Sequence, residues 1–135
     1  MPTFKRIDHV VIATEDMADA AARWERNLGL RVDERVSRPL GAAFDVARLP
    51  VGDAFIELLQ PTEEEGRFAE QLKERGEGLF SISVEVDDLD EAVAYLRGKG
   101  ADVSDARQGI WPGSRVARVS RASTHGVSIQ LIERR

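Results

Sequence analysis

Two segments of the chain share one pattern of apolar and polar positions. The first, "DHVVIATED", runs from position 8 to 16, and the second, "FSISVEVDD", runs from position 80 to 88. An offset of 72 (81 minus 9) places Ser81 over His9. Each segment has a strand-like pattern and is followed by a helical one, "MADAAARWERNLGLRV" or "LDEAVAYLRGKGADV". The chain therefore contains an internal repeat, in which one copy carries a histidine and the other a serine.

Helix boundaries follow from capping residues. Asp16 and Asp88 precede the helical patterns and can accept hydrogen bonds from the free N–H groups of the first turn. Gly29 and Gly100 follow them and suit the left-handed conformation that often ends a helix. The sequence predicts helices over 17–28 and 89–99.

Extended segments complete each half of the repeat. A polar stretch with a short helical pattern, 62–77, joins the halves. This pattern predicts an α+β fold in one domain, 1–135. Two tandem β-α-β-β-β modules, 4–61 and 78–134, would form a curved mixed sheet around a central cleft. The predicted strands are 4–13, 31–36, 42–49 and 54–60 in the first half, and 79–86, 101–104, 115–121 and 127–133 in the second.

The closing strands also match, because "FIELL" lies over "SIQLI" and places Glu57 over Gln130. Side chains alternate along a strand, so Glu57 shares a face with apolar residues, and the helices are expected to cover the opposite faces. A pseudo-two-fold between the modules would bring His9, Glu57, Ser81 and Gln130 to one cleft.

Composition narrows the classes of partner. The net charge of −5 offers little to a phosphate backbone, so nucleic acid is excluded as a partner. No apolar run approaches the roughly 20 residues of a membrane span, and no signal peptide opens the chain, so a cytoplasmic protein is expected. The absence of cysteine removes disulfides and thiolate chemistry. The final arginines, Arg134 and Arg135, are expected to form a solvated tail.

Imidazole and carboxylate groups are ordinary ligands of divalent metals, whereas serine is a poor ligand and glutamine supplies only a neutral oxygen. Together with these residues, four motifs carry a resemblance: "IDHVVIATEDM", "LPVGDAFIELLQP", "EVDDLDEAVAYLRGKGADV" and "STHGVSIQLIE". The chain resembles the vicinal oxygen chelate superfamily of glyoxalases, bleomycin-resistance proteins and extradiol dioxygenases. Within that superfamily it is similar to the methylmalonyl-CoA epimerases.

The resemblance implies paired β-α-β-β-β modules and assigns His9 and Glu57 to metal-ligand positions. Ser81 stands where the superfamily has its second histidine, and Gln130 stands where it has its final glutamate. A metal site of His9, Glu57 and Gln130 would be weak or absent. No cofactor is therefore expected, with one divalent ion of Co, Mn, Ni or Zn as the alternative.

Two functions stay open, and whether the protein is an enzyme is undecided. The first is a protein with a degenerate metal site that binds a small, apolar, oxygen-bearing ligand. The alternative is an epimerase-like isomerase or lyase acting on an acyl-CoA, with Glu57 and Gln130 as catalytic candidates. An amide cannot shuttle a proton, and "SRPLGAAFD" offers only Asp45 as a further carboxylate.

The expected ligand lies against side chains on the matched strands. The loop residue Trp111 is either a lid over the cleft or a contact in the homodimer that is also expected. The predicted ligand-binding residues are Val11, Phe55, Leu59, Ser83, Trp111, Ser128 and Ile132.

Overall fold

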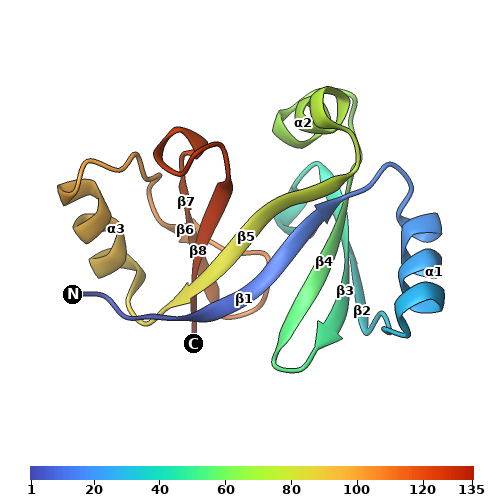
Figure 1. Cartoon of the computed structure of the whole chain (residues 1–135), viewed down its shortest axis with the longest axis horizontal. Coiled ribbons are helices and arrows are strands. Elements are labelled where there is room, and N and C mark those ends of the chain that lie inside the picture. Colours follow the sequence, from blue (N-terminus) through green and yellow to red (C-terminus); the bar gives the residue numbers. More distant parts are fainter. The chain divides into compact units, whose positions relative to one another are not determined.

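The computed structural model describes the whole chain, residues 1–135. A strand, a helix and three strands follow one another twice, with a further helix between the two sets (Figure 1). The predicted α+β class and the repeated element order are confirmed. The elements are β1 (Phe4–Ala13), α1 (Met17–Leu28), β2 (Glu34–Ser37), β3 (Phe44–Val51), β4 (Ala54–Pro61), α2 (Arg67–Arg75), β5 (Gly78–Val86), α3 (Leu89–Gly98), β6 (Arg107–Gln108), β7 (Ser114–Val119) and β8 (Ser128–Arg134), with short 3₁₀ turns at Pro39–Gly41 and Arg121–Ser123.

The eight strands form a mixed sheet in the order β2-β3-β4-β1-β5-β8-β7-β6. Strand β5 pairs with β8 in parallel, whereas β2–β3, β3–β4, β6–β7 and β7–β8 are antiparallel. The chain divides into two compact units, each described by itself below. Unit 1 comprises Met1–His9 and Ser81–Arg135, and unit 2 comprises Val10–Phe80.

The predicted caps set the ends of α1 and α3. The carboxylate of Asp16 accepts a hydrogen bond from the backbone N–H of Asp19, and Asp88 accepts one in the same way from Glu91. Helix α1 has the predicted bounds and ends at Gly29, whose φ of 75° is left-handed. Helix α3 ends one residue earlier than predicted, at Gly98.

The strand predicted over 101–104 is wrong. That stretch makes only an isolated bridge between Val103 and Val119, and the edge strand β6 lies further along, at Arg107–Gln108. The reason is that two serine hydroxyls replace backbone carbonyls as ladder partners. The backbone N–H of Asp102 donates to Oγ of Ser123, and that of Arg118 donates to Oγ of Ser104, at 3.1 and 2.8 Å.

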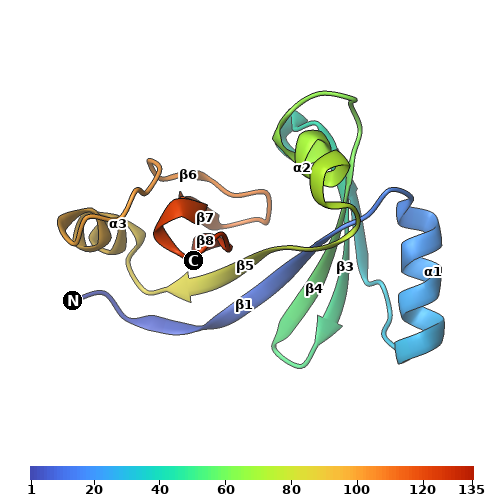
Figure 2. The ribbon, with the colours of Figure 1, turned by 45° about the horizontal axis from the view of Figure 1, so that its top comes forward.

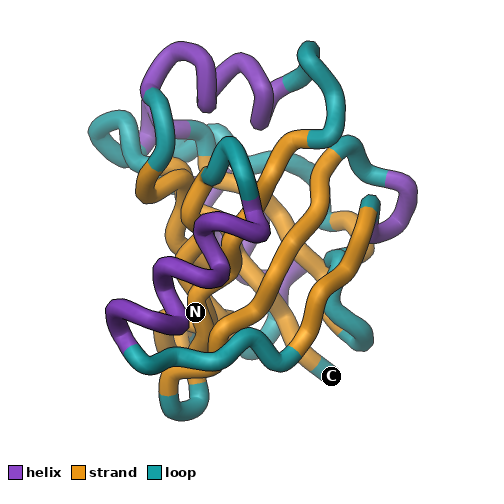
Figure 3. Tube along the Cα trace, turned by 90° about the vertical axis from the view of Figure 1, so that its right-hand side faces the viewer, coloured by secondary structure: helices purple, strands orange, loops and turns teal.

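In unit 2, helix α1 packs on one face of the strands β3 and β4, and Figure 3 views this helix from outside the unit. Leu58 and Ile56 face α1, so the predicted alternation along β4 is confirmed. Helix α2 adds the ring of Phe68, whose centroid lies 4.9 Å from that of Phe44 and 5.0 Å from that of Phe80.

In unit 1, helix α3 packs against the strands β7 and β8, as Figures 1 and 2 both show. Val86 and Leu131 belong to this core and are almost completely buried. Their neighbours Glu85 and Gln130 must then point to the opposite face of the sheet. None of the three helices is long and apolar enough to cross a membrane.

The loop that carries Trp111 depends on a close approach at Gly109. A Cβ added there would overlap Oγ of Ser114 and lie 3.2 Å from a methyl carbon of Val116. Ser114 is buried, and its hydroxyl donates to the carbonyl of Trp111, so it cannot easily move away.

We therefore expect Gly109→Ala to lower the free energy of unfolding by about 1–3 kcal/mol through overpacking. Gly98→Ala is the matched control, because nothing lies within 4 Å of its added Cβ and the residue is helical. Urea denaturation of both variants measures the difference. Equal free energies of unfolding for the two variants would show that the loop accommodates the added Cβ and would contradict this expectation.

Candidate functional site

The sheet face of unit 1 turned away from α3 is polar. Strand β5 places Ser81, Ser83 and Glu85 on this face, and all three are buried. The β5–β8 register sets Ser83 directly beside Gln130, and Ser81 beside Ser128. Polar side chains on a buried sheet face need hydrogen-bond partners, so their contacts define what the site can do.

Ser83 is the centre of a hydrogen-bonded chain. Its hydroxyl donates to Oε1 of Gln130 at 2.8 Å and lies 3.0 Å from Nε2 of His9, on strand β1. Ser83 and His9 are buried, whereas Gln130 is half-buried. Two of the four predicted cleft residues are therefore linked through Ser83, and Ser81 has no hydrogen bond to either of them.

The second ring nitrogen of His9 contacts Asp8. Nδ1 lies 2.7 Å from Oδ2 of Asp8, and a carboxylate only accepts, so this nitrogen donates. The hydroxyl of Ser83 thus lies between Nε2 of His9 and Oε1 of Gln130. The imidazole is held at both ring nitrogens, by a carboxylate at one and by a hydroxyl at the other.

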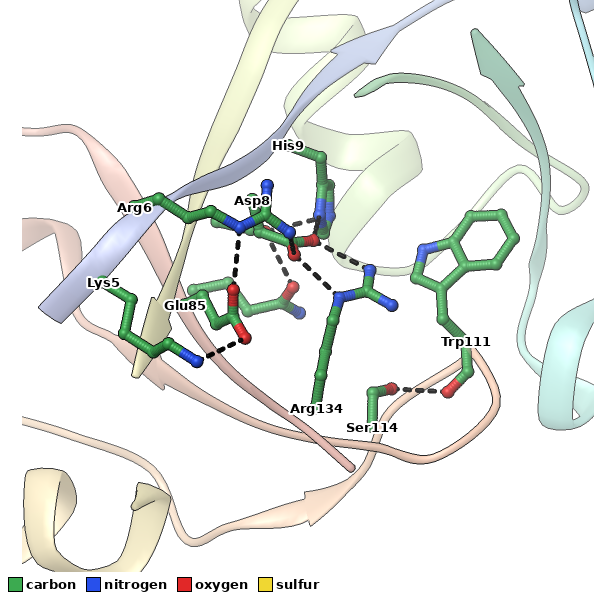
Figure 4. Close-up of polar contacts among 10 residues, drawn as sticks. Lys5, Arg6, Asp8, His9, Glu85, Trp111, Ser114 and Arg134 are labelled. Carbon is green, nitrogen blue, oxygen red and sulfur yellow. Dashed lines mark hydrogen bonds and ion pairs between the residues drawn. The ribbon is translucent and has the colours of Figure 1, made fainter. Parts of the chain in front are cut away.

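Asp8 is fully buried and held by cations (Figure 4). Arg134 donates to both carboxylate oxygens, at 2.7 and 2.9 Å, and Arg6 donates to Oδ1 at 3.0 Å. Burial by itself would raise the pKa of Asp8. Hydrogen bonds from His9 and Arg134, with the positive charges of both, outweigh it and hold that pKa well below its ordinary value.

Further charged residues extend this network. Arg6 also donates to Glu85 at 2.8 Å, and Lys5 lies 3.6 Å from the other oxygen of Glu85 (Figure 4). The prediction that the final arginines form a solvated tail is wrong for Arg134, whose side chain is only 28% exposed. It holds for Arg135, which is 68% exposed.

The sequence reading missed Asp8, Arg134, Arg6 and Glu85. Asp8 carried one usable signal, because it directly precedes the candidate histidine. Arg134 lies 126 positions from Asp8 in the chain, and no local sequence pattern predicts a contact between them.

Glu57, the remaining predicted cleft residue, belongs to unit 2. It is buried on β4, opposite Arg48 of β3 in the strand register. Its convergence with the residues of unit 1 stays a prediction. Trp111 is only 4% exposed and belongs to unit 1. The other predicted ligand-binding residues are buried as well: Val11, Phe55 and Leu59 in unit 2, and Ser83, Ser128 and Ile132 in unit 1.

The donor set of unit 1 does not fit a divalent metal ion. The two atoms of this group that could best bind a metal are Nε2 of His9 and Oε1 of Gln130. Both contact the hydroxyl of Ser83 instead. Neither unit gathers three or more His, Cys, Asp or Glu side chains in a metal-binding arrangement. Serine and a neutral amide are weak replacements for imidazole and carboxylate.

Comparison with known proteins gives the class. The model of the glyoxalase/bleomycin resistance protein/dioxygenase superfamily matches residues 8–117. Human mitochondrial methylmalonyl-CoA epimerase is 35% identical over 95 residues, which are 70% of this chain and 53% of that protein. The chain thus spans about half the length of the human enzyme. The uncharacterized protein YqjC of Bacillus subtilis is 30% identical over 95% of this chain and 91% of its own length.

Solved structures agree with this assignment. A variant of Streptomyces coelicolor methylmalonyl-CoA epimerase, in complex with 2-nitronate-propionyl-CoA, is 27% identical with a TM-score of 0.88, covering 98% of this chain and 99% of that chain. The Mycobacterium tuberculosis epimerase is 28% identical with a TM-score of 0.88, covering 98% and 89%. The chain belongs to the glyoxalase/bleomycin resistance protein/dioxygenase superfamily, and methylmalonyl-CoA epimerases are among its relatives.

Proposed function

We propose that this protein binds a small, largely apolar ligand with oxygen substituents, without a tightly held metal ion. The observation that carries the proposal is the chain from His9 through Ser83 to Gln130. Residues at two superfamily ligand positions are joined to each other by a hydroxyl. Such convergent polar groups beside apolar side chains are typical of a small-molecule site.

The predicted ligand-binding residues in unit 1 support this proposal. Ile132 and Ser128 share a strand face with Gln130, because they alternate with the core residue Leu131. An apolar side chain and a hydroxyl thus flank the half-buried amide.

Binding can be tested by titrating acyl-CoA thioesters and aromatic ketones while following thermal stability and tryptophan fluorescence. A ligand at about 100 times its dissociation constant raises the free energy of unfolding by about 2.7 kcal/mol. We expect stabilisation by at least one class in protein treated with a chelator. Stabilisation that requires added metal would contradict the proposal.

We expect the purified protein to retain well under one divalent ion per chain. Elemental analysis after dialysis against a mild chelator measures this retention. Restoring the superfamily's ligand types with Ser81→His and Gln130→Glu should raise the affinity for Co²⁺, because an imidazole and a carboxylate replace two weak donors. Near-stoichiometric metal in the wild-type protein would contradict the first expectation, and no gain in the double variant would contradict the proposed convergence.

The second candidate function is that of an epimerase acting on an acyl-CoA. It is favoured by the relatives and by likeness over nearly the whole chain. Against it, Gln130 cannot exchange a proton at neutral pH. Asp45, on β3, accepts hydrogen bonds from the hydroxyl of Ser37 and the backbone N–H of Arg38, so it is already used within its own hairpin.

A homodimer is part of the proposal. Strand β1 exposes two large apolar side chains of unit 1, Phe4 at 47% and Ile7 at 55%, and an isologous contact would cover them. Analytical ultracentrifugation at about tens of micromolar, a concentration at which specific interfaces are populated, should show a dimer. Sedimentation as a 15.0 kDa monomer would contradict this expectation.

A further inference from the structure

The amide of Gln130 has a defined orientation. Its oxygen, Oε1, accepts the hydrogen bond from Ser83, so the planar amide directs Nε2 away from that hydroxyl. Nε2 makes no hydrogen bond within the chain. Every buried side-chain nitrogen or oxygen has a partner, so Nε2 must be accessible to solvent. The half-buried Gln130 therefore ends the chain with two free N–H donors.

The contacts of Ser83 hold this orientation of the amide. Its hydroxyl donates to Oε1 of Gln130 at 2.8 Å and is itself positioned by His9, whose Nε2 lies 3.0 Å away and whose Nδ1 lies 2.7 Å from Asp8. Ser83 and His9 are both buried, so the hydroxyl has little freedom to move away from the amide oxygen.

The charges of the network around Asp8 favour an oxygen atom of the ligand over a cation. The network around Asp8 contains three basic side chains, Lys5, Arg6 and Arg134, against two carboxylates, Asp8 and Glu85. A surplus of positive charge disfavours a cation and favours an oxygen that carries negative charge.

We infer that Nε2 of Gln130 is a hydrogen-bond donor to a carbonyl or carboxylate oxygen of the ligand. This inference rests on the proposed function and specifies its chemistry. The position that the superfamily resemblance assigns to a metal-binding oxygen is here a site for an oxygen acceptor, and Ser83 sets that specificity by holding the amide in one orientation.

Two matched pairs of probes test the inference in the intact protein. Propionyl-CoA and S-propyl-CoA differ by one carbonyl oxygen, and so do 1-acetonaphthone and 1-ethylnaphthalene. In at least one pair, the carbonyl compound should bind about five- to tenfold more tightly, the value of one neutral hydrogen bond. Gln130→Leu should abolish this preference, and Gln130→Glu should abolish or reverse it, because a carboxylate only accepts.

Matched substitutions distinguish the role of the Gln130 amide from unspecific effects of mutation on binding. Gln108→Glu makes the same chemical change at an exposed position of β6 and should leave the preference intact. Ser83→Ala frees the amide to rotate and should reduce the preference. Ser123→Ala removes a hydroxyl from the exposed turn Arg121–Ser123, outside the site, and should preserve it.

The side-chain NH₂ signals of Gln130 give a direct readout. They are assigned by their loss in Gln130→Leu, and they should shift on adding the preferred carbonyl compound but not its matched hydrocarbon or thioether. Equal binding of both members of a bound pair, or an NH₂ group that contacts Ser83 in nuclear Overhauser spectra, would overturn the inference and leave the proposed function standing. Binding of no probe at all would overturn both.

Discussion

Replacing Arg134 with methionine should destabilise the protein by about 2–4 kcal/mol at neutral pH. Arg134 donates two hydrogen bonds to the fully buried carboxylate of Asp8, and its loss leaves that charge undercompensated. Removing one partner of a buried ion pair typically costs about 3–5 kcal/mol. The expected value is somewhat lower, because Arg6 still binds Asp8 and the side chain of Arg134 is 28% exposed.

The neighbouring residue supplies the control for this experiment. Arg135 is 68% exposed, and its ion pair with Glu133 spans 3.4 Å, so Arg135→Met should change the stability by less than about 0.5 kcal/mol. Urea denaturation at pH 7 compares the two variants. Equal effects would show that Arg134 contributes no more than a surface charge.

The same contact sets a pH dependence. Folding lowers the pKa of Asp8, so this carboxylate contributes stability that is fully present above its ordinary pKa of 3.8 and is lost as the pH falls towards the folded value. Arg134→Met should bring the folded pKa back towards 3.8. The stability difference between the two proteins should therefore be constant near neutral pH and narrow below about pH 4.

Most of the fold could be predicted because its signals are local. The caps at Asp16 and Asp88 and the alternation along β4 each depend on a few neighbouring residues, and the structure confirms them. The prediction of a strand over 101–104 failed because the hydroxyls of Ser104 and Ser123 accept hydrogen bonds that a continuous ladder would give to backbone carbonyls. Local propensity does not reveal such competitors.

The candidate site could be predicted only in part. The repeat pointed to His9 and Gln130, which the structure links. It placed Ser81 at the metal-ligand position and Ser83 only among the residues that contact the ligand. The register of β5 and β8 decides that Ser83 stands beside Gln130, and pairing between distant strands is not visible in a repeat. Alternation along β1 assigns Asp8 to the face opposite His9, so the pattern does not predict the contact between them.

The second large effect concerns catalysis. Epimerisation requires a base that removes the α-proton and an acid that returns it on the other face, and such groups contribute about 10²- to 10⁴-fold each. Gln130 is an amide, and the carboxylate of Asp45 is engaged within its hairpin. Only Glu57 remains of the predicted carboxylates. We therefore expect the protein to accelerate α-proton exchange by no more than a small factor.

The most direct test is exchange of the α-proton of methylmalonyl-CoA in deuterated water, followed by mass spectrometry with and without added Co²⁺. A methylmalonyl-CoA epimerase assayed in parallel establishes the sensitivity. A ligand-binding protein with a degenerate metal site should leave exchange at the background rate, even at substrate concentrations that stabilise the fold. Exchange at an enzymatic rate that is abolished by Glu57→Gln would contradict that account and establish an epimerase.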